Sequence, residues 1–172
     1  MSVVISGLGP EHDRSDFDCG EPALNSFLQK LVRQQAKRDF NRSYVACAPG
    51  ETRIRGYYAI SSASIDFDNW PPGLQLPRYP VPVVRIGRLA VDLRQQGTGV
   101  GAALLQHAMH LTVSLAQQIG VYAVVVDAKH EAATAFYARY GFQRFPEQKL
   151  SMFLPTTVIR RALVVANPSS AS

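Results

Sequence analysis

One stretch of the chain constrains its fold more than any other. It covers residues 85–115 and reads RIGRLAVDLRQQGTGVGAALLQHAMHLTVSL. The stretch opens as an apolar run typical of a strand, crosses a loop with three glycines, and continues with apolar residues at helical spacing. The first amides of a helix have no partners within it, so this order of elements can hold a phosphate group. We therefore expect an α/β domain with an anion-binding loop before this helix.

The loop itself, Arg94-Gln95-Gln96-Gly97-Thr98-Gly99-Val100-Gly101, fits the pattern R/Q-x-x-G-x-G/A. Glycines let phosphate oxygens approach the backbone, and they allow positive φ angles. A P-loop is excluded because no Lys follows the glycines. A dinucleotide fingerprint is excluded because the spacing is G-x-G-x-G, without an acidic residue about twenty positions on. The alternative that stays open is a glycine-rich turn that only connects a strand to a helix.

The composition, 47% hydrophobic and 18% charged, is that of a globular chain. Its length suits one domain, which we expect at residues 1–165 with a frayed tail at 166–172. A net charge of +5 suits an anionic partner, such as a phosphate-rich cofactor or RNA. Cys19 and Cys47 are too few and too far apart for a metal site or a disulfide framework, which favours a reduced, cytoplasmic setting and no metal. No apolar run approaches the ~18 residues of a membrane span, so no membrane contact is expected.

The hydrophobic pattern predicts the order β-α-α-β-β-β-α-β-α-β-β, an α/β fold with a mixed, twisted central sheet flanked by helices. Strands are expected at residues 3–5, 43–48, 54–60, 83–91, 121–126, 142–145 and 150–154. Helices are expected to open at Pro22, to continue through a basic stretch that ends near Phe40, and to cover 99–119, 130–140 and 156–165. Five prolines at positions 71–82 predict an extended connection, either a functional loop over a site or a plain surface excursion.

Two segments resemble the GCN5-related N-acetyltransferase (GNAT) family. RLAVDLRQQGTGVGAALL is similar to its motif A, and VDAKHEAATAFYARYGF to its motif B with the FY-x-x-x-GF ending. The resemblance implies the GNAT fold and an acyltransferase that uses acetyl-coenzyme A (acetyl-CoA). It also implies that the splayed fourth strand holds the pantetheine arm and the thioester oxygen, while the glycine loop holds the pyrophosphate. The cofactor-binding residues expected on this basis are Leu89, Ala90, Val91, Arg94, Gln95, Gln96, Gly97, Thr98, Gly99, Val100, Gly101 and Ala102.

Further segments narrow the resemblance. FDCGEPALNSFL, RSYVA, IRGYYAIS and VPVVRIGRLAVD are similar to the toxin branch of the family, so the resemblance spans residues 17–142. That branch acetylates the amino group of aminoacyl-tRNA, which blocks translation. Its members are paired with a ribbon-helix-helix antitoxin, and related toxins suggest a homodimer. Phosphate contacts dominate RNA affinity, so basic residues are the candidate contacts: Arg33, Lys37, Arg38, Arg42, Arg78 and Arg85. The alternatives are a solvated helix face for the first four and a buried ion pair for Arg85.

Amide formation from a thioester needs a proton for the departing thiolate, and Tyr137 is the predicted donor. A phenol with a pKa of about 10 is protonated at neutral pH. Its place in the Phe136-Tyr137 pair matches the tyrosine that faces the cofactor sulfur in the family. The alternative is a core aromatic whose hydroxyl is satisfied nearby, which is our interpretation of Phe136 and Tyr140.

The acceptor amine can react without a protein base, because an aminoacyl α-amino group is less basic than a lysine with its pKa of about 10.4. Asp92, at the end of the fourth strand, could serve as a base, but we expect it to be a solvated cap. We expect His12, His107 and His110 as surface residues, and His130 as a neighbour of a helix cap rather than a base. Two other functions stay open. One is acetylation of a small-molecule or protein amine, and the other is a catalytically silent fold that binds coenzyme A or an antitoxin.

Overall fold

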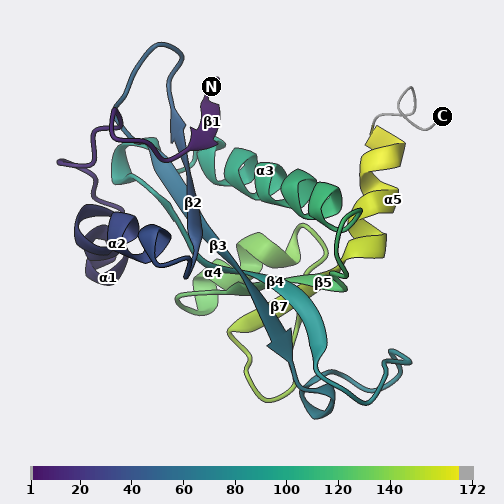
Figure 1. The fold of residues 1–172 in the computed structure, drawn as a ribbon. Coiled ribbons are helices and arrows are strands. Elements are labelled where there is room, and N and C mark those ends of the chain that lie inside the picture. Colours follow the sequence, from purple (N-terminus) through teal and green to yellow (C-terminus); the bar gives the residue numbers. More distant parts are fainter. Residues whose placement is uncertain (1, 167–172) are drawn as a thin grey trace. The chain divides into compact units, whose positions relative to one another are not determined.

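The computed structural model describes residues 2–166, which divide into two compact units. Residues 2–61 and 86–108 form the first unit, and residues 62–85 and 109–166 form the second. The expected order of elements is confirmed, including the final helix (Figure 1). The strands, in the sheet order β1-β2-β3-β4-β5-β7-β6, are β1 (Val4–Gly7), β2 (Arg42–Cys47), β3 (Gly56–Ile65), β4 (Val81–Val91), β5 (Ala123–Asp127), β7 (Ser151–Pro155) and β6 (Gln143–Arg144). The helical elements are α1 (Pro22–Ser26), η1 (Phe27–Leu31), α2 (Val32–Lys37), η2 (Phe67–Asn69), η3 (Leu93–Gln95), α3 (Val100–Leu115), α4 (Glu131–Ala138) and α5 (Thr156–Ala166). A single domain over 1–165 stays a prediction.

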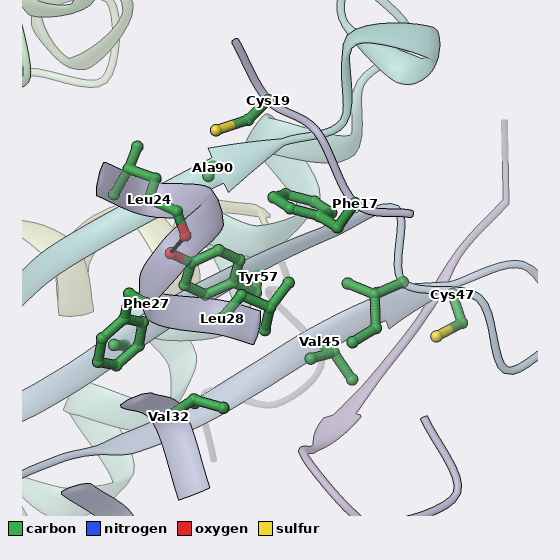
Figure 2. Close-up of a cluster of buried hydrophobic side chains, with 12 residues drawn as sticks. Phe17, Cys19, Leu24, Phe27, Leu28, Val32, Val45, Cys47, Tyr57 and Ala90 are labelled. Atoms are coloured by element: carbon green, nitrogen blue, oxygen red, sulfur yellow. Dashed lines mark hydrogen bonds between the residues drawn. The ribbon is translucent and has the colours of Figure 1, made fainter. Parts of the chain in front are cut away.

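The core of the first unit forms where the N-terminal helices pack on the sheet. β2 pairs antiparallel with both β1 and β3. From β3, Tyr57 faces α1 and η1, and its ring lies 5.6 Å from that of Phe17 and 6.0 Å from that of Phe27. The Tyr57 hydroxyl donates to the Leu24 carbonyl at 2.7 Å, the dashed line in Figure 2. Burying such large rings with a satisfied hydroxyl fixes the N-terminal helices against the strands.

The opposite face of the same strands receives α3, because consecutive strand residues point to opposite sides. Tyr58 faces α3, where its hydroxyl lies 2.7 Å from His107 Nδ1. Strand and helix approach closely at Gly56, since a Cβ there would lie 2.9 Å from Leu104 and 3.1 Å from the Ala90 carbonyl oxygen. The first half of α3 is therefore seated on β3, which fixes the start of the helix after the glycine loop.

The first helical run differs from its prediction in two details. It begins at Pro22 as expected, because proline suits the first turn of a helix. A π-helical turn at Phe27–Leu31 interrupts it, which the spacing of apolar residues does not predict. The run ends at Lys37 rather than near Phe40, because Asp39 adopts a φ of 61°, outside the helical region.

The second unit is built on β7, which pairs antiparallel with β5 and with β6. The expected C-terminal antiparallel pair is thus confirmed. Trp70, at the start of the proline-rich connection, packs edge-on against Tyr122, Phe145 and Phe153 with ring centroids 5.3, 5.0 and 4.9 Å away. The connection is therefore anchored in this core at its first residue, while Tyr79 near its end is exposed.

Several boundaries differ from the predicted ones. α3 ends at Leu115 rather than at 119, and Ile119, which extends the apolar periodicity in the sequence, is 53% exposed. β5 begins at Ala123, two residues later than expected. α5 includes Ala166, and the rest of the expected tail, 167–172, lies outside the described residues. Within residues 2–166, no helix combines the length and the apolar character needed to cross a membrane.

Candidate active site

The glycine loop joins β4 to α3 within the first unit, and two of its glycines adopt backbone angles that other residues rarely take. Gly97 has a φ of 81° and Gly99 a φ of 94°. A Cβ at either position would meet no atom within 4 Å, so the space beside this backbone is open. The loop therefore exposes bare backbone, which suits the close approach of an anion.

The amides that follow are free of helical partners. The first hydrogen bond of the α3 ladder runs from the Ala103 N–H to the Gly99 carbonyl at 3.0 Å. The amides of Val100, Gly101 and Ala102 precede it and so have no acceptor within the helix. They also lie at the positive end of the helix dipole. These residues fit a diphosphate such as that of acetyl-CoA.

The polar side chains of the glycine loop make hydrogen bonds that fix the shape of the loop. Thr98 Oγ1 donates to the Gln95 carbonyl at 2.5 Å. Gln96 Nε2 donates to the carbonyls of Cys19 and Val91 at 3.2 and 3.0 Å, and Gln95 is buried. Three of the residues predicted to bind the cofactor therefore stabilise the shape of the loop. Their side chains are engaged within the protein, so the loop backbone is the part that can contact a ligand.

Arg94, one of the residues expected to bind the cofactor, is engaged by carboxylates. Its Nε and Nη2 donate to the Asp92 carboxylate at 2.9 and 3.0 Å, and Nη2 lies 3.3 Å from Asp16. Asp92 also accepts the N–H groups of Arg94 and Asp18, at 2.9 and 3.2 Å. Since Asp92 is only 1% exposed, it is a buried cap, and the expectation of a solvated one is wrong.

The balance of forces on Asp92 sets how its stabilising effect depends on pH. Burial alone would raise the pKa of Asp92, but hydrogen bonds from Arg94 and Asp18, with the Arg94 charge, outweigh burial and lower the pKa to about 2. The unfolded carboxyl titrates near pH 3.9. Because the folded pKa is the lower one, the carboxylate contributes about 2 kcal/mol of stability above pH 5, which is lost as the pH falls from about 4 to 2.

We therefore expect Asp92→Asn to lower the free energy of unfolding by about 2 kcal/mol at pH 7, and by roughly half as much at pH 3. Urea denaturation at the two pH values measures both. Asp68→Asn, which removes an exposed carboxylate from η2, is the control and should stay within about 0.5 kcal/mol of wild type. An Asp92→Asn deficit of equal size at both pH values would contradict this account.

The end of β4 carries the other residues predicted to bind the cofactor. The side chain of Ala90 lies in the buried cluster drawn in Figure 2, together with Phe17 and Tyr57. By strand alternation, Leu89 and Val91 point their side chains to the other face. That the backbone amides of Leu89 and Val91 bind the pantetheine arm and the thioester oxygen stays a prediction.

Tyr137, the predicted proton donor, lies on α4 in the second unit. Its side chain is 5% exposed, and its ring contacts those of Phe136 and Phe142 at 5.1 and 5.7 Å. Its hydroxyl makes no hydrogen bond to any residue from 2 to 166, whereas the buried hydroxyls of Tyr57 and Tyr58 each have a partner. The Tyr137 oxygen is not among the fully buried, unpaired side-chain atoms of residues 2–166, so solvent or a ligand can reach it. Tyr137 is therefore not a core tyrosine whose hydroxyl is satisfied by a neighbouring residue.

The environment of Tyr137 keeps its phenol protonated. Burial raises the pKa of Tyr137, and the negative charge of Asp127 raises it further. A proton donor with a raised pKa is fully protonated at neutral pH. The neighbouring Phe136 and Tyr140 are half-buried rather than in the core, so that interpretation of them is corrected.

Two histidines expected at the surface are enclosed. The His12 side chain is 8% exposed and accepts the Gly9 N–H at 2.9 Å, and the half-buried His107 packs on Tyr58. His110 is exposed, as expected. His130 is the N-cap of α4, so the expected place at the helix start is confirmed. These placements follow from packing, which a single polar residue in a sequence does not reveal.

A basic groove with a volume of about 920 Å³ lies in the first unit, between α2 and the start of β2. No acidic residue is among the described residues that line it. Arg42 pairs with Asp39 at 2.7 Å and is therefore partly neutralised. Lys30 also lines the groove but was not predicted to do so. It lies three residues before Arg33 and seven before Lys37, a spacing that places the three side chains on one helix face. The cations that line the groove are Lys30, Arg33, Lys37, Arg38 and Arg42.

The two remaining predicted RNA contacts belong to the second unit. Arg78 stands over the ring of Phe67, 5.9 Å from its centroid. Arg85 places its Nε 3.3 Å from Asp127 Oδ2, and both side chains are about one-third exposed, at 35% and 38%. Arg85 is thus in an ion pair, although not a buried one.

Comparison with known proteins supplies a family for this arrangement. A family model described as an acetyltransferase (GNAT) domain matches residues 41–144. A tRNA-acetylating toxin of Mycobacterium tuberculosis is 36% identical over 144 residues, which cover 83% of this chain and 85% of the relative. A probable toxin TacT of Sinorhizobium fredii is 33% identical over 168 residues, covering 91% and 93%.

Solved structures agree with the sequence relatives. A crystal structure of a tyrosine-to-phenylalanine mutant of KacT has a TM-score of 0.87 at 32% identity, covering 94% of this chain and 99% of KacT. AtaT complexed with acetyl-methionyl-tRNAfMet has a TM-score of 0.86 at 31% identity, covering 94% and 99%. A mutant AtaT toxin bound to the C-terminus of the antitoxin AtaR and to acetyl-CoA has a TM-score of 0.81 at 31% identity, covering 94% and 98%.

Proposed function

Because this chain belongs to the GNAT acetyltransferase family and uses acetyl-CoA, we propose that it acetylates the α-amino group of aminoacyl-tRNA. Blocking that amino group would inhibit translation, which makes the chain the toxin of a type II toxin–antitoxin pair. The relatives at 36% and 33% identity carry the names tRNA-acetylating toxin and probable toxin TacT, and they support this acceptor.

The observation that carries the proposed acceptor is the basic groove. Five cations line it without a carboxylate among its described residues, and its volume of about 920 Å³ exceeds what a small amine would fill. A line of cations along one groove matches the spaced charges of a phosphate backbone. We assign the RNA contacts to Arg33, Lys37, Arg38 and Arg42 with Lys30, and we keep Arg78 as a peripheral contact.

In this mechanism each residue has a defined task. Bound acetyl-CoA supplies an acetyl thioester and a thiolate leaving group. The Val100, Gly101 and Ala102 amides would hold its diphosphate. The Leu89 and Val91 amides would polarise the thioester carbonyl, an effect worth about 3 kcal/mol per donor.

The remaining two steps are proton transfers, one to the departing sulfur and one from the acceptor amine. The Tyr137 phenol, which its raised pKa keeps protonated, would donate its proton to the departing sulfur, and the phenolate would take a proton back from solvent. The acceptor amine would give its own proton to water.

A single backbone position tests the assignment of the glycine loop. We expect Gly99→Ala to raise the Kd for acetyl-CoA at least about tenfold, because alanine at a φ of 94° costs about 1–2 kcal/mol and its Cβ enters the space assigned to the phosphates. Isothermal titration calorimetry measures the Kd. Gly50→Ala is the matched control, since Gly50 has a φ of 76° and equally open surroundings on a turn. Equal Kd values for the two variants would refute the assignment.

The acceptor is tested by incubating charged tRNA with the protein and acetyl-CoA and weighing the products by mass spectrometry. We expect a mass increase of one acetyl group on the aminoacyl end. A panel of polyamines and lysine-containing peptides provides the comparison. Robust transfer to those amines, with none to charged tRNA, would replace the proposed acceptor by a small-molecule or protein amine.

We also propose that the antitoxin partner is a ribbon-helix-helix protein, that the toxin is a homodimer and that both act in the cytoplasm, where charged tRNA occurs. The structure of AtaT with the C-terminus of AtaR and a KacTA–DNA complex support an antitoxin partner. A small neighbouring reading frame with a ribbon-helix-helix pattern would favour the pair. Light scattering gives the mass of the isolated protein, and a monomer would refute the homodimer.

A further inference from the structure

Arg88 of β4 has no task in the mechanism above, although it directly precedes Leu89 in the strand. Its guanidinium carbon lies 3.9 Å from the centre of the Phe27 ring, over the ring face, in a cation–π contact. Phe27 is buried, with 1% of its surface exposed, and Arg88 is half-buried. The positive charge of Arg88 is therefore held at one place, against η1 of the first unit.

The Arg88 guanidinium has no acceptor in the described part of the chain. Two other arginines of the first unit, Arg55 and Arg94, form ion pairs with carboxylates. Arg88 makes no hydrogen bond or ion pair with any residue that the structure describes. Its nitrogens are also not among the fully buried, unpaired atoms of those residues, so a ligand can reach them. A planar set of N–H donors, stacked on a ring and unpaired at its edge, suits bidentate binding of a phosphate.

The surroundings of Arg88 connect the fourth strand to the basic groove. Arg88 and Ala90 point to the same face of β4, because they are two residues apart. On that face, Ala90 and Phe27 belong to the buried cluster drawn in Figure 2, which also contains Val32. Val32 in turn lines the basic groove. One packed cluster of the first unit therefore extends from β4, beside Arg88, to the wall of the groove.

The covalent structure of an aminoacyl-tRNA fits this arrangement. Its α-amino group is joined through the ester to the ribose of the terminal nucleotide, and the last phosphodiester joins that nucleotide to the rest of the strand. In the proposed reaction the amine attacks a thioester held at the Leu89 amide, while the rest of the RNA lies along the groove. The last phosphodiester then lies between the two. Arg88 is the cation next to Leu89 in the strand, on the face that packs toward the groove.

We propose that Arg88, stacked on Phe27, binds the phosphate that precedes the terminal nucleotide of the acceptor RNA, and so places the aminoacyl end beside the thioester. This inference rests on the proposed function and adds the RNA contact nearest to the reacting amine. The cations of the basic groove are exposed, whereas Arg88 is half-buried and held by a ring. Its effect therefore depends on one phosphodiester, and not on the total charge of the RNA.

The test measures binding of an uncharged RNA hairpin that ends in single-stranded CCA, as a tRNA acceptor stem does. In the comparison hairpin a neutral methylphosphonate replaces the last phosphodiester, which removes one negative charge and one acceptor oxygen. We expect wild-type protein to bind the modified hairpin on the order of tenfold more weakly, because a charge-assisted, bidentate contact is lost. Fluorescence anisotropy with labelled hairpins, at one fixed salt concentration, measures both Kd values.

Variants identify the side chain that distinguishes the two hairpins. Arg88→Met removes the charge but keeps an unbranched side chain on Phe27, and it should bring the two Kd values within about twofold of each other. Arg88→Lys keeps the charge without the planar set of donors and should give an intermediate ratio. Arg161→Met, at an exposed position of α5, removes one charge and is the control that should keep the wild-type ratio. A purely structural role for Arg88 would weaken binding of both hairpins together and leave their ratio unchanged.

The possible outcomes separate this inference from the function on which it rests. An unchanged ratio in Arg88→Met would overturn the inference, as would equal or absent binding of the two hairpins by wild type. A raised Kd for acetyl-CoA in Arg88→Met, with RNA affinities as in wild type, would assign Arg88 to the coenzyme and likewise overturn it. Acetylation of charged tRNA by wild type is measured in parallel. If it occurs in any of these cases, only the Arg88 contact is wrong, and if it does not occur, the proposed acceptor itself fails.

Discussion

Replacing Tyr137 by Phe is expected to lower kcat for acetyl transfer to charged tRNA by a factor of about 10²–10⁴. The substitution removes only the hydroxyl, which has no hydrogen-bond partner among residues 2–166 and is assigned to protonate the departing sulfur. The buried ring remains, so the free energy of unfolding should change by less than about 1 kcal/mol. Single-turnover kinetics with charged tRNA, together with urea denaturation, measure the two effects separately.

Tyr140→Phe is the matched control, since Tyr140 lies one turn further along the chain, is half-buried and has no assigned role. It should retain wild-type kcat. Acetyl-CoA affinity should be unchanged in both variants, because neither side chain is assigned to the cofactor. If Tyr137→Phe kept more than about a tenth of the activity, another group would have to supply the proton. If wild type transferred acetyl to no amine at all, a silent coenzyme-binding module would be the better description.

Reversing two charges in the basic groove should have the second largest effect. We expect the double variant Arg33→Glu, Lys37→Glu to bind tRNA on the order of 10- to 100-fold more weakly at 0.1 M salt, because two phosphate contacts are lost. The slope of log affinity against log salt should fall by about 2. Electrophoretic mobility shifts at several salt concentrations measure both quantities, and calorimetry should show an unchanged Kd for acetyl-CoA.

The double variant Arg160→Glu, Arg161→Glu changes the net charge by the same amount on α5, at exposed positions that do not line the groove. It should reduce tRNA binding much less, through the long-range field alone. Equal losses in the two double variants would show that net charge, and not the groove, attracts the RNA.

The strands and helices were predictable because their periodic patterns are long. Residues 85–115 combine an apolar strand, a glycine loop and a helical repeat, and all three form where expected. The ends were less predictable, because they depend on tertiary contacts or on single backbone angles. Asp39 ends the second helical stretch through a φ of 61°, and Ile119 extends an apolar pattern beyond the end of its helix. The π-turn in the first helical run has no sequence signature that we can name.

The site was predictable in its backbone and less so in its side chains. Glycine at 97 and 99 signals positive φ directly, and both glycines adopt it. The partners of Arg94 were not predictable, because Asp16 is 78 residues away along the chain. The same holds for the burial of Asp92 and for Lys30, which joins the groove only once the helix is formed. Charge at a given position can be read from a sequence, but its neutralisation by a distant partner cannot.

The hydrogen bonds between the glycine loop and the N-terminal segment have a consequence for how variation in this chain is interpreted. The Leu93 N–H donates to the Asp18 carbonyl, and Gln96 donates to that of Cys19, across 77 residues for the second pair. The shape of the glycine loop thus depends partly on a segment that no coenzyme atom is expected to contact. A natural variant at positions 16–19 would look remote and harmless in any survey confined to the glycines, yet it would act on the same loop. The affinity of this protein for the coenzyme therefore depends on two stretches of sequence that lie far apart in the gene.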